Sequence, residues 1–321
     1  MLHSQYKGWS NSWDYTINAY SDSMNKARRG SYNWYFQQQF GMWKRLFLTF
    51  GSGMEDNSAF QKMEFTPRAS AALRFPETDT TLRAAGGKAV KAPSFLETNS
   101  LNPYYLGNPQ LKPEQNVSWE VGFDQWLWKN RVQGGLTYFE NHFTDMIQNA
   151  QTSYTTGSYF NIAAARTKGF EIYLQAKPWK GFTARTSYTY LTELKVLDAG
   201  DVVNINIIPG QNLLRRPRQS WTFDLNYIYG PLEVNFHGLY IGPRADRRPS
   251  NDAPYYATRV VNGGFFTADL AAYYTLVQNW HQVNRVKLML RGMNLFDKNY
   301  QEVFGYSSPR FQFIGGLKLQ M

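Results

Sequence analysis

The side chains best suited to chemistry in this 321-residue sequence are tyrosines and arginines that lie between its predicted strands. Tyrosine rings can stack on a flat or apolar ligand, and arginine guanidinium groups can hold carboxylates. Both are ways of binding a ligand and not of making or breaking bonds. An alternative interpretation of each residue is an ordinary interface aromatic or a charge that stabilises its loop. The candidate binding residues are Tyr104, Tyr105, Tyr154, Tyr159, Arg215, Arg216, Arg247, Arg248, Tyr255 and Tyr256.

The sequence contains no pattern typical of a catalytic or metal site. The four histidines are far apart and lack the spacing of metal ligands; they are His3, His142, His237 and His281. His237 falls on the polar side of a predicted strand, which favours an ordinary histidine facing a barrel interior. There is neither a phosphate-binding Gly-Lys-Ser/Thr loop nor a Gly-x-Ser-x-Gly nucleophile turn. We therefore expect a protein that is not an enzyme and that needs no cofactor.

The composition favours a membrane protein built from strands. Aromatic residues make up 17% of the chain, yet its mean hydropathy is only −0.51. No run approaches the ~20 apolar residues of a transmembrane helix. A transmembrane β-barrel exposes only every second residue to lipid, so low hydropathy with many aromatics fits that class. The chain has no cysteine and therefore gives no indication of its redox compartment.

The net charge of +10 has two interpretations. One is nucleic-acid binding by basic residues interleaved with aromatics. The aromatics, however, follow the period of a strand and do not cluster with lysine and arginine. We therefore expect the charges to line a barrel interior and its loops, where they would also suit an anionic ligand, and we expect no nucleic-acid partner.

About 14 segments alternate between apolar and polar residues, as strands with two different faces do. Residues 116–126 and 220–229 alternate most clearly. The other predicted strands are 13–20, 32–39, 43–50, 68–75, 82–86, 132–138, 170–177, 182–190, 232–236, 266–275, 285–291 and 311–321. The sequence therefore predicts an all-β, antiparallel fold.

The predicted connections alternate between short and long. Turns are expected at Gly41 and at 76–79, 129–130, 178–181 and 230–231, and long loops at 51–62, 89–112, 144–165, 191–216 and 242–262, besides a polar loop up to Gly30. Short turns at one end and long loops at the other are typical of outer-membrane barrels. A soluble β-sandwich or propeller would not need this asymmetry. With 14 strands, the first strand would start and the last would end on the side of the short turns.

Two groups of motifs resemble the TonB-dependent outer-membrane receptors. The first comprises KAPSFLE at 91–97, GNPQLKPE at 107–114 and SWEVGFD at 118–124. In that family a strand runs into a KAPS turn, an outer loop follows, and NPxLKPE leads back into the barrel. The second group, NLFDKNY at 294–300 with GY at 305–306, resembles the end of such receptors. Two departures stand out, because the family's Pro-Gly-Arg lacks its glycine at Pro309-Arg310, and Met321 replaces the usual terminal aromatic that directs assembly.

The resemblance implies a transmembrane antiparallel β-barrel in a Gram-negative outer membrane. Receptors of this family have 22 strands, an N-terminal plug and a preceding TonB box, so about 14 strands would be the C-terminal portion of a barrel. We expect one domain over residues 1–321, without the plug. No signal peptide is visible, which indicates a piece of a longer protein. An arc of strands leaves two edges that lipid does not tolerate, so closure by this segment alone is not expected.

The resemblance also implies energy-coupled uptake. The NLFDKNYQEVFGY stretch is more similar to the siderophore and cobalamin branch than to glycan importers. The implied partners are outer-membrane lipid, an extracellular small-molecule cargo, and the TonB complex through the N-terminal part. No histidine lies between Pro93 and Asn108, where the haem-receptor branch carries one, which argues against haem. The alternatives are a glycan importer of the same family and a passive pore or adhesion barrel.

Overall fold

The fold is almost entirely β, as the alternation predicts. The computed structural model describes residues 2–14, 19–60, 62–151, 156–199, 208–248, 258–280 and 283–320. These residues form eighteen strands, one short α-helix and one turn of 3-10 helix. None of the helices in this part of the chain is long and apolar enough to cross a membrane.

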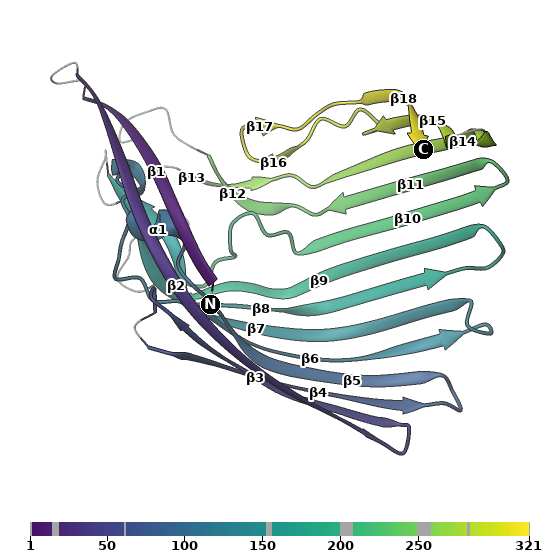
Figure 1. Cartoon of the computed structure of the whole chain (residues 1–321), viewed down its shortest axis with the longest axis horizontal. Coiled ribbons are helices and arrows are strands. Elements are labelled where there is room, and N and C mark those ends of the chain that lie inside the picture. Colours follow the sequence, from purple (N-terminus) through teal and green to yellow (C-terminus); the bar gives the residue numbers. More distant parts are fainter. Residues whose placement is uncertain are drawn as a thin grey trace.

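Fourteen strands form one antiparallel sheet in which successive strands lie side by side (Figure 1). Across the sheet they are β1 (Leu2–Asp14), β2 (Ala19–Met42), β3 (Leu46–Asn57), β4 (Glu64–Phe75), β5 (Thr80–Lys91), β6 (Glu114–Leu127), β7 (Val132–Gln151), β8 (Gly157–Ala176), β9 (Phe182–Asp198), β10 (Gln219–Tyr229), β11 (Leu232–Ile241), β14 (Phe265–Trp280), β15 (Val283–Met293) and β18 (Gln312–Gln320). The order of the strands confirms a barrel-type meander. The sheet is not closed, because β1 and β18 stand at its two edges.

The two ends of the sheet differ, which confirms the predicted asymmetry. At one end the described turns are short, at 43–45, 76–79, 128–131, 177–181 and 230–231. At the other end the connections are long and carry α1 (Phe95–Asn99), the 3-10 turn η1 (Pro103–Tyr105), the hairpin of β12 (Arg244–Arg248) and β13 (Thr258–Asn262), and that of β16 (Gln301–Val303) and β17 (Tyr306–Ser307). We call these the short-turn end, at the right of Figure 1, and the long-loop end, at the left.

One face of the sheet is apolar and continuous from strand to strand. In register, Leu82 of β5 lies opposite Phe123 of β6, which lies opposite Leu136 of β7. Closer to the long-loop end the rings of Tyr138 and Phe170 on neighbouring strands are 5.1 Å apart. Same-face neighbours across strands stabilise a sheet by direct contact. Leu82, Phe123 and Phe170 are exposed on the protein and Leu136 and Tyr138 are half-buried, as expected for a face that meets lipid.

The opposite face is polar and cross-linked. Arg83 of β5 is 3.2 Å from both Glu120 and Asp124 of β6, and the Tyr173 hydroxyl of β8 donates to Asp124 at 2.8 Å. His237 lies on this face, as predicted, with Nδ1 2.7 Å from a carboxylate oxygen of its cross-strand partner on β10. The described residues bury few apolar side chains within the protein itself; the core cluster, Val196 and Ala199 with Met146 and Leu213, lies at the long-loop end.

The strand predictions are wrong at the N-terminal side. Residues 13–20, predicted as one strand, contain the end of β1 and the start of β2, and Trp13 pairs with Tyr20 across a hairpin. Residues 15–18 lie outside the described part. The predicted polar loop up to Gly30 and the predicted turn at Gly41 both belong to β2. Since β1 pairs only with residues 19–31 of β2, the first strand starts at the long-loop end and not at the short-turn end.

Several predicted loops are partly strand. β7 and β8 extend across much of 144–165, β9 extends to Asp198, β3 extends to Asn57, and β12 and β13 lie within 242–262. These extensions project past the part of the sheet with an apolar face. Apolar residues there, such as Ile147, Leu194 and Val196, are buried within the protein and do not form a lipid-facing stripe, so the alternation that marks a lipid-facing strand is lost.

Candidate functional site

The connection between β5 and β6 is a compact loop held by the residues of the first motif. Ser94 caps α1, because its Oγ accepts the Glu97 N–H at 3.2 Å and the Glu97 carboxylate accepts the Ser94 N–H at 2.6 Å. Arg29 of β2 donates to the Pro93 carbonyl at 2.5 Å and lies 4.6 Å from the Phe95 ring centroid. The KAPS segment therefore begins a helix, and Arg29 fastens this helix to β2.

The second half of the loop is fastened to β7 and β8. Asn108 donates through Nδ2 to the Tyr159 carbonyl at 2.9 Å, and Leu111 beside it is buried. Glu114 accepts the Ile147 N–H at 2.7 Å. The polar residues of the GNPQLKPE motif thus satisfy backbone groups of the long-loop end, which is a structural role.

Gly107, the first residue of that motif, lies where no side chain fits. An added Cβ would be 2.5 Å from the Ser100 N and 2.6 Å from the Asn99 N. The Gly107 N–H donates to the Ser100 carbonyl at 2.8 Å, so neither backbone can move aside without losing that bond.

We expect Gly107→Ala to loosen the loop at a cost of about 1–3 kcal/mol, because overpacking displaces the backbone. Amide hydrogen exchange of residues 95–111 should rise by about tenfold or more, while that of the sheet stays the same. Gly263→Ala is the control, since nothing lies within 4 Å of a Cβ there. Unchanged exchange in Gly107→Ala would contradict the close packing.

Two of the predicted tyrosines lie near each other, Tyr105 within this loop and Tyr159 on β8. η1, which contains Tyr105, packs against β8, since the Leu106 N–H donates to the Gly157 carbonyl at 2.8 Å. Burial raises the pKa of the Tyr159 phenol, and the nearby Glu97 carboxylate and Tyr105 raise it further. Tyr104 lies in η1, with its side chain outside the description, and Tyr154 lies outside the described residues.

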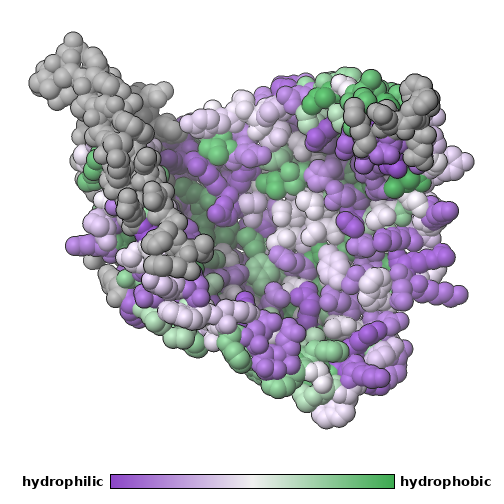
Figure 2. Space-filling model, in the orientation of Figure 1, coloured by the Kyte–Doolittle hydropathy of each residue, from purple (hydrophilic) through white to green (hydrophobic). Residues whose placement is uncertain are grey.

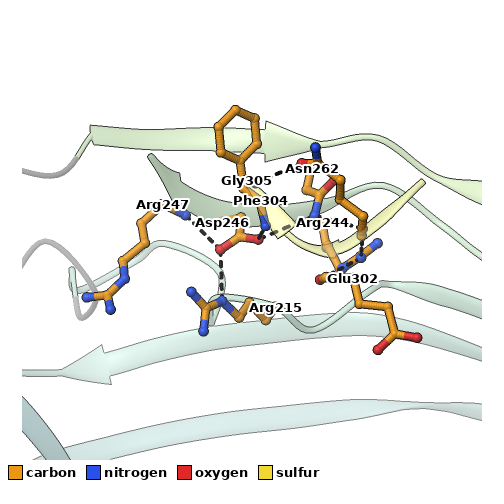
Figure 3. A network of polar contacts seen from close by, with 9 residues as sticks. Arg215, Arg244, Asp246, Arg247, Asn262, Glu302, Phe304 and Gly305 are labelled. Atoms are coloured by element: carbon orange, nitrogen blue, oxygen red, sulfur yellow. Dashed lines mark hydrogen bonds and ion pairs between the residues drawn. The ribbon is translucent and has the colours of Figure 1, made fainter. Parts of the chain in front are cut away.

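A second group of candidate residues surrounds Asp246 of β12, whose side chain is 0% exposed. One carboxylate oxygen accepts Arg215 Nε at 2.9 Å and the Arg247 N–H at 2.8 Å. The other accepts the Phe304 N–H at 2.7 Å and Asn262 Nδ2 at 3.3 Å (Figure 3). We call these four contacts the Asp246 network. It joins the loop before β10, the β12–β13 hairpin and the β16–β17 hairpin.

Arg244 lies beneath the network with only 6% of its surface exposed. Its Nη2 donates to the carbonyls of Gln301 and Glu302 at 2.7 Å each. Burial lowers the pKa of Arg244, against the opposite effect of Asp246 and Glu302. For the Asp246 carboxyl, burial by itself would raise the pKa, but the bonds from Arg215, Phe304 and Arg247 outweigh it and lower the pKa below its ordinary value. Asp246 is therefore ionised at neutral pH.

An open pocket of about 660 Å³ lies beside the network. Arg215 contacts Asp246 through Nε, and among the described residues no acceptor is bound to its two Nη groups, whose donors can therefore reach a ligand. Figure 3 shows the guanidinium groups of Arg215 and Arg247 extending to the same side of the hairpin. Two such groups beside hydroxyls can hold an anionic ligand. The pocket is lined by Arg215, Arg247, Tyr300, Glu302, Val303, Phe304, Tyr306, Ser307, Ser308 and Pro309.

The other arginine predictions are placed differently. Arg248 lies over the Phe304 ring, 5.0 Å from its centroid. Arg216 is exposed and does not line the pocket. Tyr255 and Tyr256 lie outside the described residues. Sequence reasoning missed Asp246, for which the only signal is its position as a lone acid in Arg-Ala-Asp-Arg-Arg. Among the described residues, no three His, Cys, Asp or Glu side chains are grouped so as to hold a metal ion.

The NLFDK motif orders the loop before β18 through Asp297. Asp297 Oδ1 accepts Arg310 Nε at 2.8 Å and the Phe311 N–H at 3.0 Å. These two bonds lower the pKa of Asp297 to about 2. A depressed carboxyl pKa stabilises the loop above the ordinary value of 3.8, and this contribution is lost as the pH falls through about 2.

We therefore expect residues 294–311 to keep their hydrogen-exchange protection at pH 4 and to lose it only near pH 2. Asp297→Asn should lose protection at every pH, because it removes the charge that Arg310 binds. Loss of protection in the unmodified protein at pH 4 would contradict the ion pair.

Comparison with known proteins extends these observations. The family described as TonB dependent receptor-like, beta-barrel matches residues 3–295. The chain resembles the siderophore receptor PirA from Acinetobacter baumannii with a TM-score of 0.71 and 19% identity, over 91% of this chain and 46% of PirA. It also resembles the copper transporter OprC, with a TM-score of 0.71 and 17% identity over 98% of this chain and 52% of OprC. A third similar structure is the pyoverdine outer-membrane receptor FpvA from Pseudomonas aeruginosa PAO1, bound to pyoverdine. Its TM-score is 0.69 and its identity 16%, over 93% of this chain and 43% of FpvA.

At these identities the similarity to solved structures concerns the fold. The chain spans about half the length of the solved structures that it matches.

Proposed function

The chain belongs to the TonB-dependent receptor β-barrel family, and from this we propose that it is part of an outer-membrane receptor for a ferric siderophore or a similar scarce nutrient, such as cobalamin. In this proposal residues 1–321 are the C-terminal portion of the barrel domain. The long-loop end faces the outside and binds the cargo, and energy for uptake comes from the TonB complex. The similarity to PirA and FpvA supports this class of cargo, since PirA is named as a siderophore receptor and FpvA as a pyoverdine outer-membrane receptor.

The observation that carries the proposal is the pocket beside the Asp246 network. Ferric complexes of catechol and carboxylate chelators are anionic and of moderate size. The volume of about 660 Å³ falls within the usual range of small-molecule sites. Arg215 and Arg247 would neutralise the charge of such a complex, and Tyr300 and Tyr306 would contact its rings. A receptor for this cargo needs such groups on its outer loops, where diffusing ligand first meets the protein.

The test uses the full-length protein in outer-membrane vesicles. Ferric catecholate, carboxylate and hydroxamate siderophores, cobalamin and oligosaccharides are titrated against tryptophan fluorescence, and iron uptake is followed with and without a functional TonB. We expect saturable binding of one ferric siderophore and TonB-dependent uptake. Saturable binding of an oligosaccharide instead would indicate a glycan importer. Unsaturable passage of small solutes without TonB would indicate a passive pore, and either result would overturn the proposal.

A further inference from the structure

Three turns at the short-turn end carry the same pair of residues, a tryptophan followed by a lysine. The tryptophan side chains are strongly exposed, at 80%, 61% and 59% in chain order. Indole rings prefer the boundary between membrane and water, where the ring is shielded and the N–H stays hydrated. The repeat therefore indicates that this end meets the headgroup layer of a membrane. The pairs are Trp43-Lys44, Trp128-Lys129 and Trp179-Lys180.

The second and third of these turns carry positive charge without a carboxylate to balance it. Arg131, Lys177 and Lys180 are exposed, and none forms an ion pair within the described part of the chain. The first turn differs, because Arg45 pairs with Glu77 of the next turn. Figure 2 shows hydrophilic side chains gathered over the short-turn end.

A pocket of about 400 Å³ lies where the three cations converge, and we call it the rim pocket. Arg131, Lys177 and Lys180 line it together with the rings of Trp179 and Phe182. Arg131 Nη1 donates to the Pro178 carbonyl of the adjoining turn at 3.1 Å, which fixes its guanidinium group beside the lysines.

The rim pocket adjoins the apolar face of the sheet. Trp179 stacks on Phe182 with ring centroids 4.7 Å apart, and Phe182 is in register with Tyr227 on that face. Thr183 and Asn226, which also line the pocket, belong to the polar face. The pocket therefore combines cations with a direct path onto the surface that meets lipid tails.

We propose that the rim pocket binds the phosphate headgroup of an anionic phospholipid in the leaflet at the short-turn end. Arg131, Lys177 and Lys180 hold the phosphate, Trp179 lies at the level of the glycerol, and the acyl chains follow the apolar face from Phe182. Guanidinium and ammonium groups are the usual partners of phosphate oxygens. A free phosphate would contact only the three cations, whereas a lipid contacts the cations with its headgroup and the rings of Trp179 and Phe182 with its apolar part.

Native mass spectrometry of the intact protein in detergent tests the proposal, with phosphatidylglycerol and phosphatidylethanolamine as probes. We expect phosphatidylglycerol to bind about tenfold more tightly than phosphatidylethanolamine, and Lys177→Gln/Lys180→Gln to lower its affinity by about tenfold. Both lysines are exposed, so the double variant should fold. Arg131 is kept, because it bonds to Pro178.

The matched control is Lys195→Gln/Lys298→Gln, which removes the same charge from exposed positions at the long-loop end. It should bind phosphatidylglycerol like the unmodified protein. Equal binding of the two lipids, or unchanged binding by Lys177→Gln/Lys180→Gln, would overturn the proposal. Displacement of phosphatidylglycerol by excess inorganic phosphate would do so as well, since it would indicate a site for free anions.

Discussion

Replacing Asp246 with alanine is expected to release the β12–β13 hairpin from its neighbours and to weaken binding of the proposed cargo by about 100-fold. The substitution removes the acceptor of four hydrogen bonds and leaves the guanidinium of Arg215 without its partner. Removing one member of a buried ion pair costs on the order of 3–5 kcal/mol. Here the local cost should fall toward the lower end, because Arg215 is partly exposed.

Two measurements check this expectation. Ligand titration should show the loss of affinity, and hydrogen exchange should rise in residues 208–218, 258–262 and 301–307. The sheet should keep its protection, because its ladder does not depend on Asp246. Asp246→Asn should have an affinity and an exchange rate between those of the unmodified protein and Asp246→Ala, since the amide oxygen still accepts hydrogen bonds while the charge is lost. Asp56→Ala, which removes an exposed carboxylate at the same end, is the control. Unchanged exchange in Asp246→Ala would show that the three loops are held otherwise.

The sheet could be predicted from sequence because lipid imposes a simple constraint on its strands. Trp221, Phe223 and Leu225 of β10 must face the same side, so polar residues have to fill the positions between them. The register confirms this, since each of the three lies opposite a residue of the same face on β9. The predicted boundaries are accurate only where that constraint acts.

Outside the apolar face the constraint disappears, and prediction fails with it. Residues 19–30 of β2 pair with β1 and not with β3, and their sequence lacks a regular alternation of apolar and polar residues. Alternation cannot distinguish such a strand from a loop. The sequence between β1 and β2 also contains no Gly or Pro that would indicate a boundary between two strands.

The candidate site was predictable only as a set of separate residues. Tyrosine and arginine in long loops identify Arg215 and Arg247 as binders, but nothing in their spacing brings them together. The contact between Arg215 and Asp246 joins positions 31 residues apart, and that between Asp246 and Phe304 joins positions 58 apart. Similarly, the GNPQLKPE motif points to the family, whereas its physical role, holding a loop on β7 and β8, is visible only in the fold.

Arg247→Ala is expected to weaken binding of an anionic cargo by about tenfold to 100-fold without changing the fold. Its guanidinium lines the pocket, whereas only its backbone N–H joins the Asp246 network, so the network survives the substitution. A charge-assisted contact of this kind contributes on the order of 1.5–3 kcal/mol, which corresponds to that loss of affinity. Ligand titration at low and high salt checks the expectation, because the affinity of the unmodified protein should fall more steeply with salt than that of Arg247→Ala.

Arg216→Ala is the matched control, because Arg216 lies in the loop before β10 at the same end, is exposed, and does not line the pocket. A general effect of positive charge on ligand approach would lower the affinity of both variants alike. A contact within the pocket lowers it for Arg247→Ala alone. The full-length protein could instead bind a ligand whose affinity neither variant changes. Such a ligand either places an uncharged part in this pocket or binds elsewhere on the long-loop end. The two arginines would then serve the loops and not the cargo, and the cluster of Tyr105 and Tyr159 would become the place to search for it.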